Sequence, residues 1–468
     1  STYIFLFLLF GAFLVQTGVG NYFNDLAITI AGKRTGGPAK VAIFSSALQG
    51  TISGSSVANT VTTGSYTIPM MKRLGYHRNF AGAVEAAAST GGQIMPPIMG
   101  AAAFLMIEFA GVSYWNIAKA ALIPAILYFA GIWIMTHLEA KRLGLHGLPA
   151  DQIPKVKTVL KKIHLLLPIL IIVFLLFKGF SIERTALLGI LSTIIVSLFL
   201  KETRINFARF IEALTSGART ALGVAAATAC AGIIVGVVTK TGLGLKMGNS
   251  LVSIAGSISS NVQMQLILTL VFTMITSLIL GMGSPTTANY IITSTIALPA
   301  ILALNDMLPV AIPVLAGHMF VFYFGIVADI TPPVALAAFA ATGISGGNPI
   351  RTGVNAAKLA IAAFIIPYMF VLQPELLMID TTFFEILFIL ATAIAGMIAI
   401  GAGLIGYWYT KLNWVFRIIS VIGGLMLMYP GLYTDIGGVV IFAFMLVTQF
   451  ISNRNQTKGE PPVQMAGN

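Results

Sequence analysis

Residues 53–59 read Ser-Gly-Ser-Ser-Val-Ala-Asn and residues 283–289 read Gly-Ser-Pro-Thr-Thr-Ala-Asn, two polar stretches inside long apolar segments. Glycine, proline and hydroxyl side chains interrupt a helix there and free backbone amides and carbonyls. At membrane depth, such interruptions are tolerated only around a polar cavity or a bound ion. The predicted breaks span 50–56 and 281–285, and two further segments are interrupted at 91–97 and 329–333. We therefore expect four broken helical segments: 41–71, 80–107, 265–300 and 312–343.

The composition around these segments is that of a polytopic membrane protein. Of the 468 residues, 57% are hydrophobic and 9% are charged, whereas a soluble domain carries about 25% charged residues. A soluble enzyme and a disordered chain are excluded, because a water-soluble fold cannot bury so many apolar residues. The net charge is +12, but the basic residues lie between the apolar runs, so no nucleic-acid partner is expected. The single cysteine, Cys230, excludes a disulfide framework.

Nine other apolar segments approach the roughly 20 residues that a membrane span needs. They lack period-2 alternation and are expected to be helices: 3–31, 113–137, 164–180, 184–200, 220–255, 358–377, 384–410, 412–429 and 436–451. Charged and apolar residues alternate at 201–219, which predicts a separate amphipathic helix at the membrane interface. The polar tail 452–468 is expected to be disordered.

An internal repeat relates the two halves of the chain. Segments 17–32 and 241–256 match at an offset of 224 residues, Asn59 and Asn289 at 230, the Pro-Pro pairs at 236, and Lys119 with Lys358 at 239. A drift of 15 residues over four ordered matches argues against coincidence.

The charges of the loops indicate that the two repeats are inverted. Lys and Arg flank both ends of 41–71, which predicts a hairpin that enters the membrane from inside the cell and returns. Its counterpart 265–300 has no Lys or Arg in either flank, so its ends are expected outside. We therefore expect an all-α polytopic membrane protein with an inverted-topology repeat and two re-entrant helical hairpins. Such repeats belong to secondary transporters, and the alternative is a channel built from opposed half-helices.

The expected organisation follows from these segments. Residues 1–140 form the first repeat, with hairpin 41–71 and broken helix 80–107, and residues 141–219 form linker helices and the amphipathic helix. Residues 220–377 form the second repeat, with hairpin 265–300 and broken helix 312–343. C-terminal helices at 384–451 and the tail 452–468 complete the chain.

Hydroxyl, carboxamide and freed carbonyl oxygens at both tips could bind a cation such as Na⁺, or could merely satisfy broken backbone. Asp329 lies deep in a break where the first repeat has Gln93. It is a cation ligand, a proton carrier or the cap of the half-helix that follows. Glu85 is expected to pair with Arg78 or Arg73 near the basic loop. The chain has no phosphate-binding loop and no HExxH motif, which argues against an ATPase or a metalloprotease.

Segments 51–59, 88–97, 280–288 and 330–335 resemble the large (M-type) permease subunit of the tripartite ATP-independent periplasmic (TRAP) transporters. Segments 36–40, 139–145 and 320–323 resemble the TAXI-type branch, in which small and large permease parts are commonly fused. The resemblance covers about residues 1–377. The chain begins at Ser1 without Met, and we expect that it lacks the first helices of the family, as a truncation or as a separate chain.

This resemblance implies an elevator-type Na⁺ symporter in the bacterial inner membrane. It would import a small organic anion, such as a C4-dicarboxylate or a dicarboxylic amino acid, from a periplasmic substrate-binding protein. A small (Q-type) membrane subunit or a fused N-terminal domain would complete it in the lipid bilayer. The implied Na⁺ ligands are Ser53, Gly54, Ser55, Asn59, Gly91, Gly92, Gly283, Ser284, Asn289, Asp329 and Thr331. The implied substrate-binding residues, between the tips, are Ser55, Ser56, Asn59, Thr286, Thr287 and Asn289.

Overall fold

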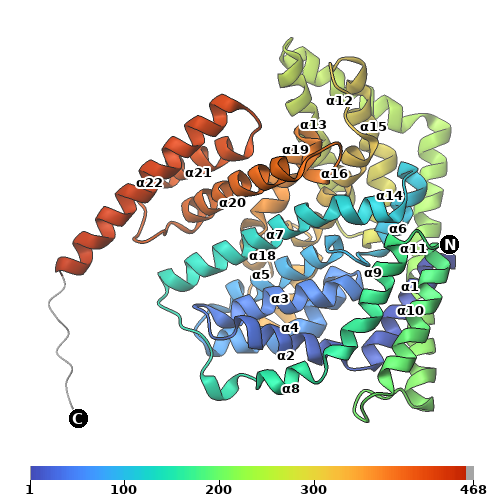
Figure 1. The fold of residues 1–468 in the computed structure, drawn as a ribbon. Helices are drawn as coiled ribbons and strands as arrows, with labels where there is room; N and C mark the ends of the chain where they lie inside the picture. The colour runs from blue at the N-terminus through green and yellow to red at the C-terminus, as the bar shows by residue number, and fades with distance from the viewer. Residues whose placement is uncertain (1, 460–468) are drawn as a thin grey trace, which may run out of the picture.

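The computed structural model describes residues 2–459, which form helices joined by short turns (Figure 1). Within this range one isolated β-bridge, Tyr407–Lys411, is the only strand-like pairing, so the expected all-helical architecture is confirmed. Seven of the described helices are long and apolar enough to cross a membrane, or up to nine spans if each of two bent helix pairs counts as one. The bent pairs join Thr2–Gln16 to Val19–Ala31 at 68° and Ala150–Leu160 to Ile163–Phe177 at 70°.

Helices α1–α10 belong to the first half of the chain and α11–α22 to the second. The first half contains α1 (Thr2–Gln16), α2 (Val19–Ala31), α3 (Gly37–Ser53), α4 (Ser56–Arg73), α5 (Arg78–Gly91), α6 (Ala101–Ala110), α7 (Tyr114–Arg142), α8 (Val156–Leu160), α9 (Leu167–Phe177) and α10 (Ile182–Ser197). The second half contains α11 (Phe207–Thr241), α12 (Leu243–Ile258), α13 (Val262–Gly281), α14 (Thr286–Ile296), α15 (Leu298–Leu302), α16 (Val314–Val327), α17 (Leu336–Ser345), α18 (Pro349–Leu359), α19 (Ile361–Leu372), α20 (Phe383–Ile405), α21 (Trp414–Met428) and α22 (Leu432–Gly459). Short 3₁₀ turns lie at Gly92–Ile94, Ala150–Gln152, Ile163–Leu166, Ala303–Asp306, Ala328–Ile330 and Pro374–Leu377.

All four expected interruptions are present, although the first is shorter than the sequence indicated. Helix α3 continues to Ser53, so only Gly54 and Ser55 separate it from α4. The hydroxyls of Ser46 and Thr63 lie 2.9 Å apart, so α3 and α4 run antiparallel as a hairpin. The breaks after α5 and α16 each begin with a 3₁₀ turn.

Three expected segments differ from the structure. Segment 3–31 is bent after Gln16, where Gly18 is left-handed (φ +79°), and segment 220–255 is interrupted at the equivalent Gly242 (φ +65°), between α11 and α12. Residues 201–219 do not form a separate interface helix, because α11 runs unbroken from Phe207 to Thr241. Asn206 caps its start by accepting a hydrogen bond from the Arg209 amide, and the helix contains no stop before Gly242.

The C-terminal part also differs from expectation. Helix α22 extends to Gly459, so residues 452–459 of the expected disordered tail are helical, and residues 460–468 lie outside the described residues. In Figure 1, α20–α22 lie on one side of the molecule and α11 lies along the other. Between them, α3, α4 and α5 pack on one another, and α17 and α18 of the second half pack against α5. The two halves are therefore interleaved at the level of the breaks.

Candidate functional site

The first tip lies between α3 and α4. Gly54 ends α3 in the left-handed conformation (φ +61°), which glycine adopts without steric cost. A Cβ atom on Gly54 would lie 3.0 Å from the Cα of Gly100, so the tip packs on the backbone of the break after α5. The Ser55 hydroxyl caps α4 by accepting a hydrogen bond from the amide of Ala58. The amino end of α4, which carries the positive end of the helix dipole, therefore lies at the tip.

The second tip lies between α13 and α14 and has the same layout. Gly281 ends α13, and Gly283 is left-handed (φ +77°). Pro285 is the capping residue of α14, where the absence of an amide proton is tolerated. The amino end of α14 also lies at its tip, so both tips offer amide donors and a partial positive charge.

A cavity of about 310 Å³ lies between the two tips. It is also lined by α1 and α11, through Leu8, Thr220 and Val224. Eight of the predicted site residues line it: Ser53, Gly54, Ser55, Ser56, Ser284, Thr286, Thr287 and Asp329. Pockets for small molecules begin at about 300 Å³, so this volume suits a small organic acid.

Each tip is bound by the break of the other repeat. The Ser56 hydroxyl donates a hydrogen bond to Oδ2 of Asp329 at 2.6 Å, and the Thr286 hydroxyl donates one to the carboxamide oxygen of Gln93. Ser56 and Thr286 are equivalent in the repeat, as are Gln93 and Asp329. The same type of contact, from a tip of one repeat to the break of the other, thus occurs twice. The acceptor is a neutral amide in one contact and a carboxyl group in the other.

Asn59 and Asn289 lie at equivalent repeat positions behind the tips, although their amide partners come from different helices, α3 and α16. The side-chain amide of Asn59 donates to the carbonyl of Ser46 at 2.9 Å, and that of Asn289 donates to the carbonyl of Gly325 at 2.5 Å. These bonds fix the orientation of both carboxamides. Both Oδ1 atoms are buried and have no hydrogen-bond partner among the described residues. An unpaired buried carboxamide oxygen is costly in isolation and is suited to bind a cation.

Six predicted residues do not line the cavity: Asn59, Asn289, Gly91, Gly92, Gly283 and Thr331. The Thr331 hydroxyl, just after the 3₁₀ turn, donates to the carbonyl of Val327 at the end of α16, at 2.8 Å. Gly92 instead allows a close approach of the backbone, because a Cβ on Gly50 would lie 2.3 Å from the Cα of Gly92. Gly91 packs against the ring of Tyr128. The structure thus gathers the tip hydroxyls and Asp329 in the cavity and leaves both asparagines behind it.

The expected ion pair of Glu85 with Arg78 or Arg73 was wrong. The Glu85 side chain is fully buried, and its carboxyl group accepts hydrogen bonds from four hydroxyls. The sequence contained one signal of this environment: Thr63 and Thr67 are spaced four residues apart on one face of α4.

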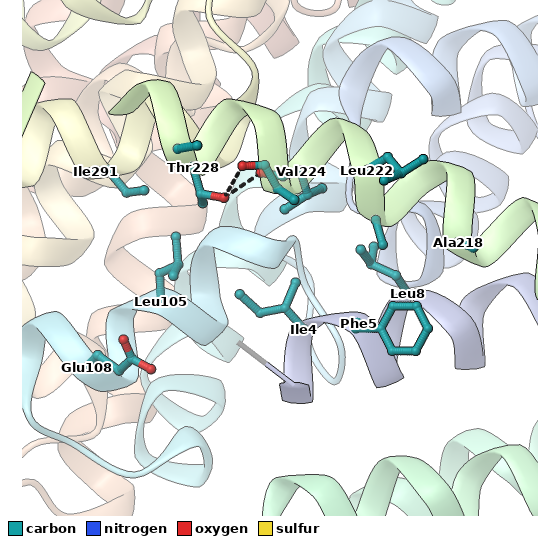
Figure 2. A pocket seen from close by; sticks show the side chains of 13 residues that line it. Ile4, Phe5, Leu8, Leu105, Glu108, Ala218, Leu222, Val224, Thr228 and Ile291 are labelled. Carbon is teal, nitrogen blue, oxygen red and sulfur yellow. Dashed lines mark hydrogen bonds between the residues drawn. The ribbon is translucent and has the colours of Figure 1, made fainter. Parts of the chain in front are cut away.

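A larger cavity of about 800 Å³ adjoins the site and is mainly apolar (Figure 2). It shares Leu8 and Val224 with the cavity between the tips. Its polar lining includes Glu108 at one end and Thr228, whose hydroxyl is satisfied by the Val224 and Ala225 carbonyls of its own helix (Figure 2). This cavity lacks the convergent oxygens of the tips, so the smaller cavity is the better candidate for a polar ligand.

Both tips lie within a match to a known protein family. The family model "Tripartite ATP-independent periplasmic transporter, DctM component" matches residues 1–386, which include both tips and both breaks. Helices α21 and α22 lie beyond that match.

Individual relatives match parts of the chain. The C4-dicarboxylate TRAP transporter large permease protein DctM of Pseudomonas aeruginosa is 30% identical over 31% of this chain and 33% of its own. The sialic acid TRAP transporter large permease protein SiaM of Vibrio cholerae is 26% identical over 47% of this chain and 51% of its own. The 2,3-diketo-L-gulonate TRAP transporter large permease protein YiaN of Escherichia coli is 27% identical over 30% of this chain and 32% of its own. The matched parts thus span about a third to a half of these relatives.

Proposed function

Because the chain belongs to the DctM component family of the tripartite ATP-independent periplasmic transporters, we propose that it imports a small organic anion by Na⁺ symport. The family consists of transporter permeases, so the chain is a multi-pass protein of the bacterial inner membrane and not an enzyme. The proposed substrates are a C4-dicarboxylate, a dicarboxylic amino acid or a related acid. The C4-dicarboxylate, sialic acid and diketogulonate relatives support this class, because all three transport acids by name.

The observation that carries the proposal is the cavity between two helix amino ends. A carboxylate bound there would accept hydrogen bonds from the hydroxyls of Ser55 and Thr287, which line the cavity. The two helix dipoles would stabilise its negative charge. A neutral or cationic solute would gain nothing from these dipoles.

The residues present fit Na⁺ as the coupling ion. Asn59 and Asn289 each offer a buried carboxamide oxygen without a partner among the described residues. Ser53 also has a buried hydroxyl without a described partner, and Gly92 lies against Asn59. These groups would hold one ion behind each tip. Bound Na⁺ would supply positive charge that offsets the charge of the organic anion.

We propose that the hairpins and broken helices, α3–α6 and α13–α17, form one transport block of an elevator. Helices α1, α2 and α9–α12 would form the scaffold against which it moves. The antiparallel α3–α4 hairpin and the opposite loop charges of its counterpart support two re-entrant hairpins in an inverted repeat. The TAXI-type branch is also a proposal, supported by segments 36–40, 139–145 and 320–323.

The proposed partners follow from the family. A periplasmic substrate-binding protein would deliver the anion, and a small Q-type membrane subunit or a fused N-terminal domain would complete the scaffold.

Uptake into proteoliposomes tests the proposal. The permease, its small membrane subunit and its purified binding protein are assayed with radiolabelled succinate, glutamate and sialic acid. We expect uptake of one of these acids under an inward Na⁺ gradient and none under an equal K⁺ gradient. Equal uptake with and without the Na⁺ gradient would refute the symport.

The second candidate is a proton-coupled carrier, or a channel, on the same scaffold, which the buried Asp329 carboxyl group favours. The Asp329→Asn variant separates the candidates in the same assay. A proton carrier loses uptake driven by a pH gradient, whereas a Na⁺ symporter with Asp329 as a ligand loses its Na⁺ dependence. A channel leaves uptake that no ion gradient can drive above equilibrium.

A further inference from the structure

We propose that Glu85 is a proton-binding site inside the first hairpin, loaded and unloaded through the hydroxyl of Thr63 from a second polar cavity. The inference goes beyond the symport of the previous section. It needs neither a known substrate nor Na⁺ coupling.

The carboxyl group of Glu85 lies in a cage of hydroxyls from three helices. Its Oε1 accepts hydrogen bonds from Ser46 of α3 at 2.5 Å, from Thr63 of α4, and from Ser89 of α5 at 3.1 Å. Its Oε2 accepts a hydrogen bond from Thr67 of α4. The side chain has no exposed surface.

Close packing of α4 against α5 brings the hydroxyls to Glu85. A Cβ atom on Gly64 would lie 3.0 Å from the Cγ of Glu85, so glycine lets α4 approach the acid. The hydroxyls of Ser46 and Thr63 are 2.9 Å apart, at hydrogen-bond distance from each other. These two hydroxyls can therefore exchange a hydrogen bond with each other as well as with the carboxyl group.

Among the described residues, no cation pairs with Glu85. The ion pairs there are Arg142–Glu139 and Lys162–Glu202. The charged and titratable side chains on the helices packed against α5 have other partners or are exposed, apart from the half-buried Lys119 of α7, which forms no hydrogen bond or ion pair with Glu85. Lys40 contacts His137, Lys72 donates to the Ser345 carbonyl, Asp329 accepts from Ser56, Tyr128 donates to the Ala87 carbonyl, and Arg73, Arg78, Lys141, Arg351 and Lys358 are exposed. An unpaired buried carboxylate is expensive at membrane depth, and a bound proton removes that cost.

The cage can satisfy both protonation states. When Glu85 is neutral, its O–H donates to one of the hydroxyl oxygens, while Thr63 and Thr67 donate to the carbonyls of Asn59 and Thr63 at 2.8 and 3.0 Å. When Glu85 is ionised, all four hydroxyls can turn to the carboxylate, which is stabilised by charge-assisted hydrogen bonds. Proton release therefore requires only rotation of hydroxyl groups.

Thr63 connects the cage to a cavity of about 440 Å³ that Asp25, Gln49 and Tyr66 also line. Gln49 is 5% exposed, and its Oε1 atom has no partner among the described residues, so this cavity contains an unused acceptor. Of the described cage residues, Thr63 alone lines the cavity. Glu85 would pass its proton to the Thr63 oxygen while Thr63 releases its own proton to cavity water or to the Asp25 carboxylate. One O–H bond breaks and one forms at each step.

Infrared difference spectroscopy of the purified permease in detergent tests the proposal. Subtracting the spectrum of Glu85→Gln from that of the parent protein should reveal the C=O band of one protonated carboxyl group. Raising the pH should convert this band reversibly into carboxylate bands. A carboxylate band at every pH, or an acid band that never titrates, would overturn the proposal. Glu108→Gln serves as the control for carboxyl subtraction.

A matched pair of threonine variants tests the route. Transfer into D₂O shifts the acid band at the rate of proton exchange. We expect Thr63→Val to slow this shift about tenfold, whereas Thr67→Val, which touches Glu85 but does not line the cavity, should leave it within about twofold. Equal rates in both variants would refute the Thr63 route, even if Glu85→Gln failed to fold. Failure of Na⁺-driven uptake would leave both readouts unaffected, so the two proposals fail separately.

Discussion

Asn59 and Asn289 show at the scale of single residues why one repeat position can be functional while its neighbours are structural. Each carboxamide uses its amide to hold a backbone carbonyl and keeps its oxygen free among the described residues. Thr331, by contrast, donates its hydroxyl to the Val327 carbonyl at the end of α16. An unpaired oxygen thus distinguishes the two asparagines from Thr331.

We predict that Asn59→Ala and Asn289→Ala each weaken Na⁺ binding at least about tenfold, a loss of ~1.4 kcal/mol. The measurement is the melting temperature of the purified permease in NaCl and in choline chloride of equal ionic strength. Na⁺ should stabilise the parent protein by mass action, and the two variants should require more Na⁺ for the same shift.

The exposed Asn116 of α7 supplies the control variant Asn116→Ala, whose Na⁺ response should match that of the parent. If Na⁺ raised the melting temperature of both tip variants as it does that of the parent, these asparagines would have only a structural role.

Residue types and spacing were enough to predict the tip hydroxyls and Asp329, because a polar break in an apolar helix is visible locally. They were not enough for Glu85. Its four partners come from three helices and include Ser46, which lies 39 residues away. The Arg residues close to Glu85 in sequence suggested an ion pair, but burial and helix packing determined the actual contacts.

At the scale of elements, glycine contacts determine how closely hairpin and break can pack. Gly50 of α3 and Gly92 of the first 3₁₀ turn meet backbone to backbone. The sequence indicated glycines at both places but suggested that Gly50 belonged to the break. In the structure Gly50 is helical, and its lack of a side chain serves close packing instead.

We predict that Gly50→Ala destabilises the permease by about 1–3 kcal/mol, because the new methyl group would overlap the backbone of Gly92. Thermal unfolding in detergent measures the loss. The control is Gly232→Ala on α11, where an added Cβ meets nothing within 4 Å. That variant should be neutral or slightly stabilised, and equal melting temperatures for the two variants would contradict the close contact.

The expected segments 201–219 and 220–255 missed both ends of α11, although Asn206 and Gly242 are local capping signals. The continuity of α11 was missed as well, since charged residues at its beginning suggested a separate interface helix. A membrane-facing helix tolerates them at its end, where long side chains reach the interface.

At the scale of the whole molecule, the proposed transport block and scaffold meet between α1 and α3. A Cβ on Gly11 would lie 3.2 Å from the carbonyl oxygen of Ile52 and 3.4 Å from its Cγ2. Side chains at these two positions are therefore neighbours, and a cysteine pair there can be tested for cross-linking.

We predict the effect of a Gly11→Cys, Ile52→Cys pair in a Cys230→Ser background. Oxidation should lower the uptake rate at least about tenfold, and reduction should restore it, because the disulfide would tie the moving block to its scaffold. The control pair Gly189→Cys, Ile172→Cys lies within the proposed scaffold, where a Cβ on Gly189 would be 2.8 Å from the Cδ1 of Ile172. It should transport normally when oxidised. Full uptake by the oxidised Gly11–Ile52 pair would show that these helices move together.

The crossed contacts of the tips have an evolutionary consequence. In two identical chains paired head to tail, both crossings would have the same acceptor, and any substitution in one would appear in the other. Joining the halves in one polypeptide allowed one acceptor to be an amide, Gln93, and the other an acid, Asp329. A single polypeptide can thus carry a titratable group at one crossed contact and a neutral amide at the other.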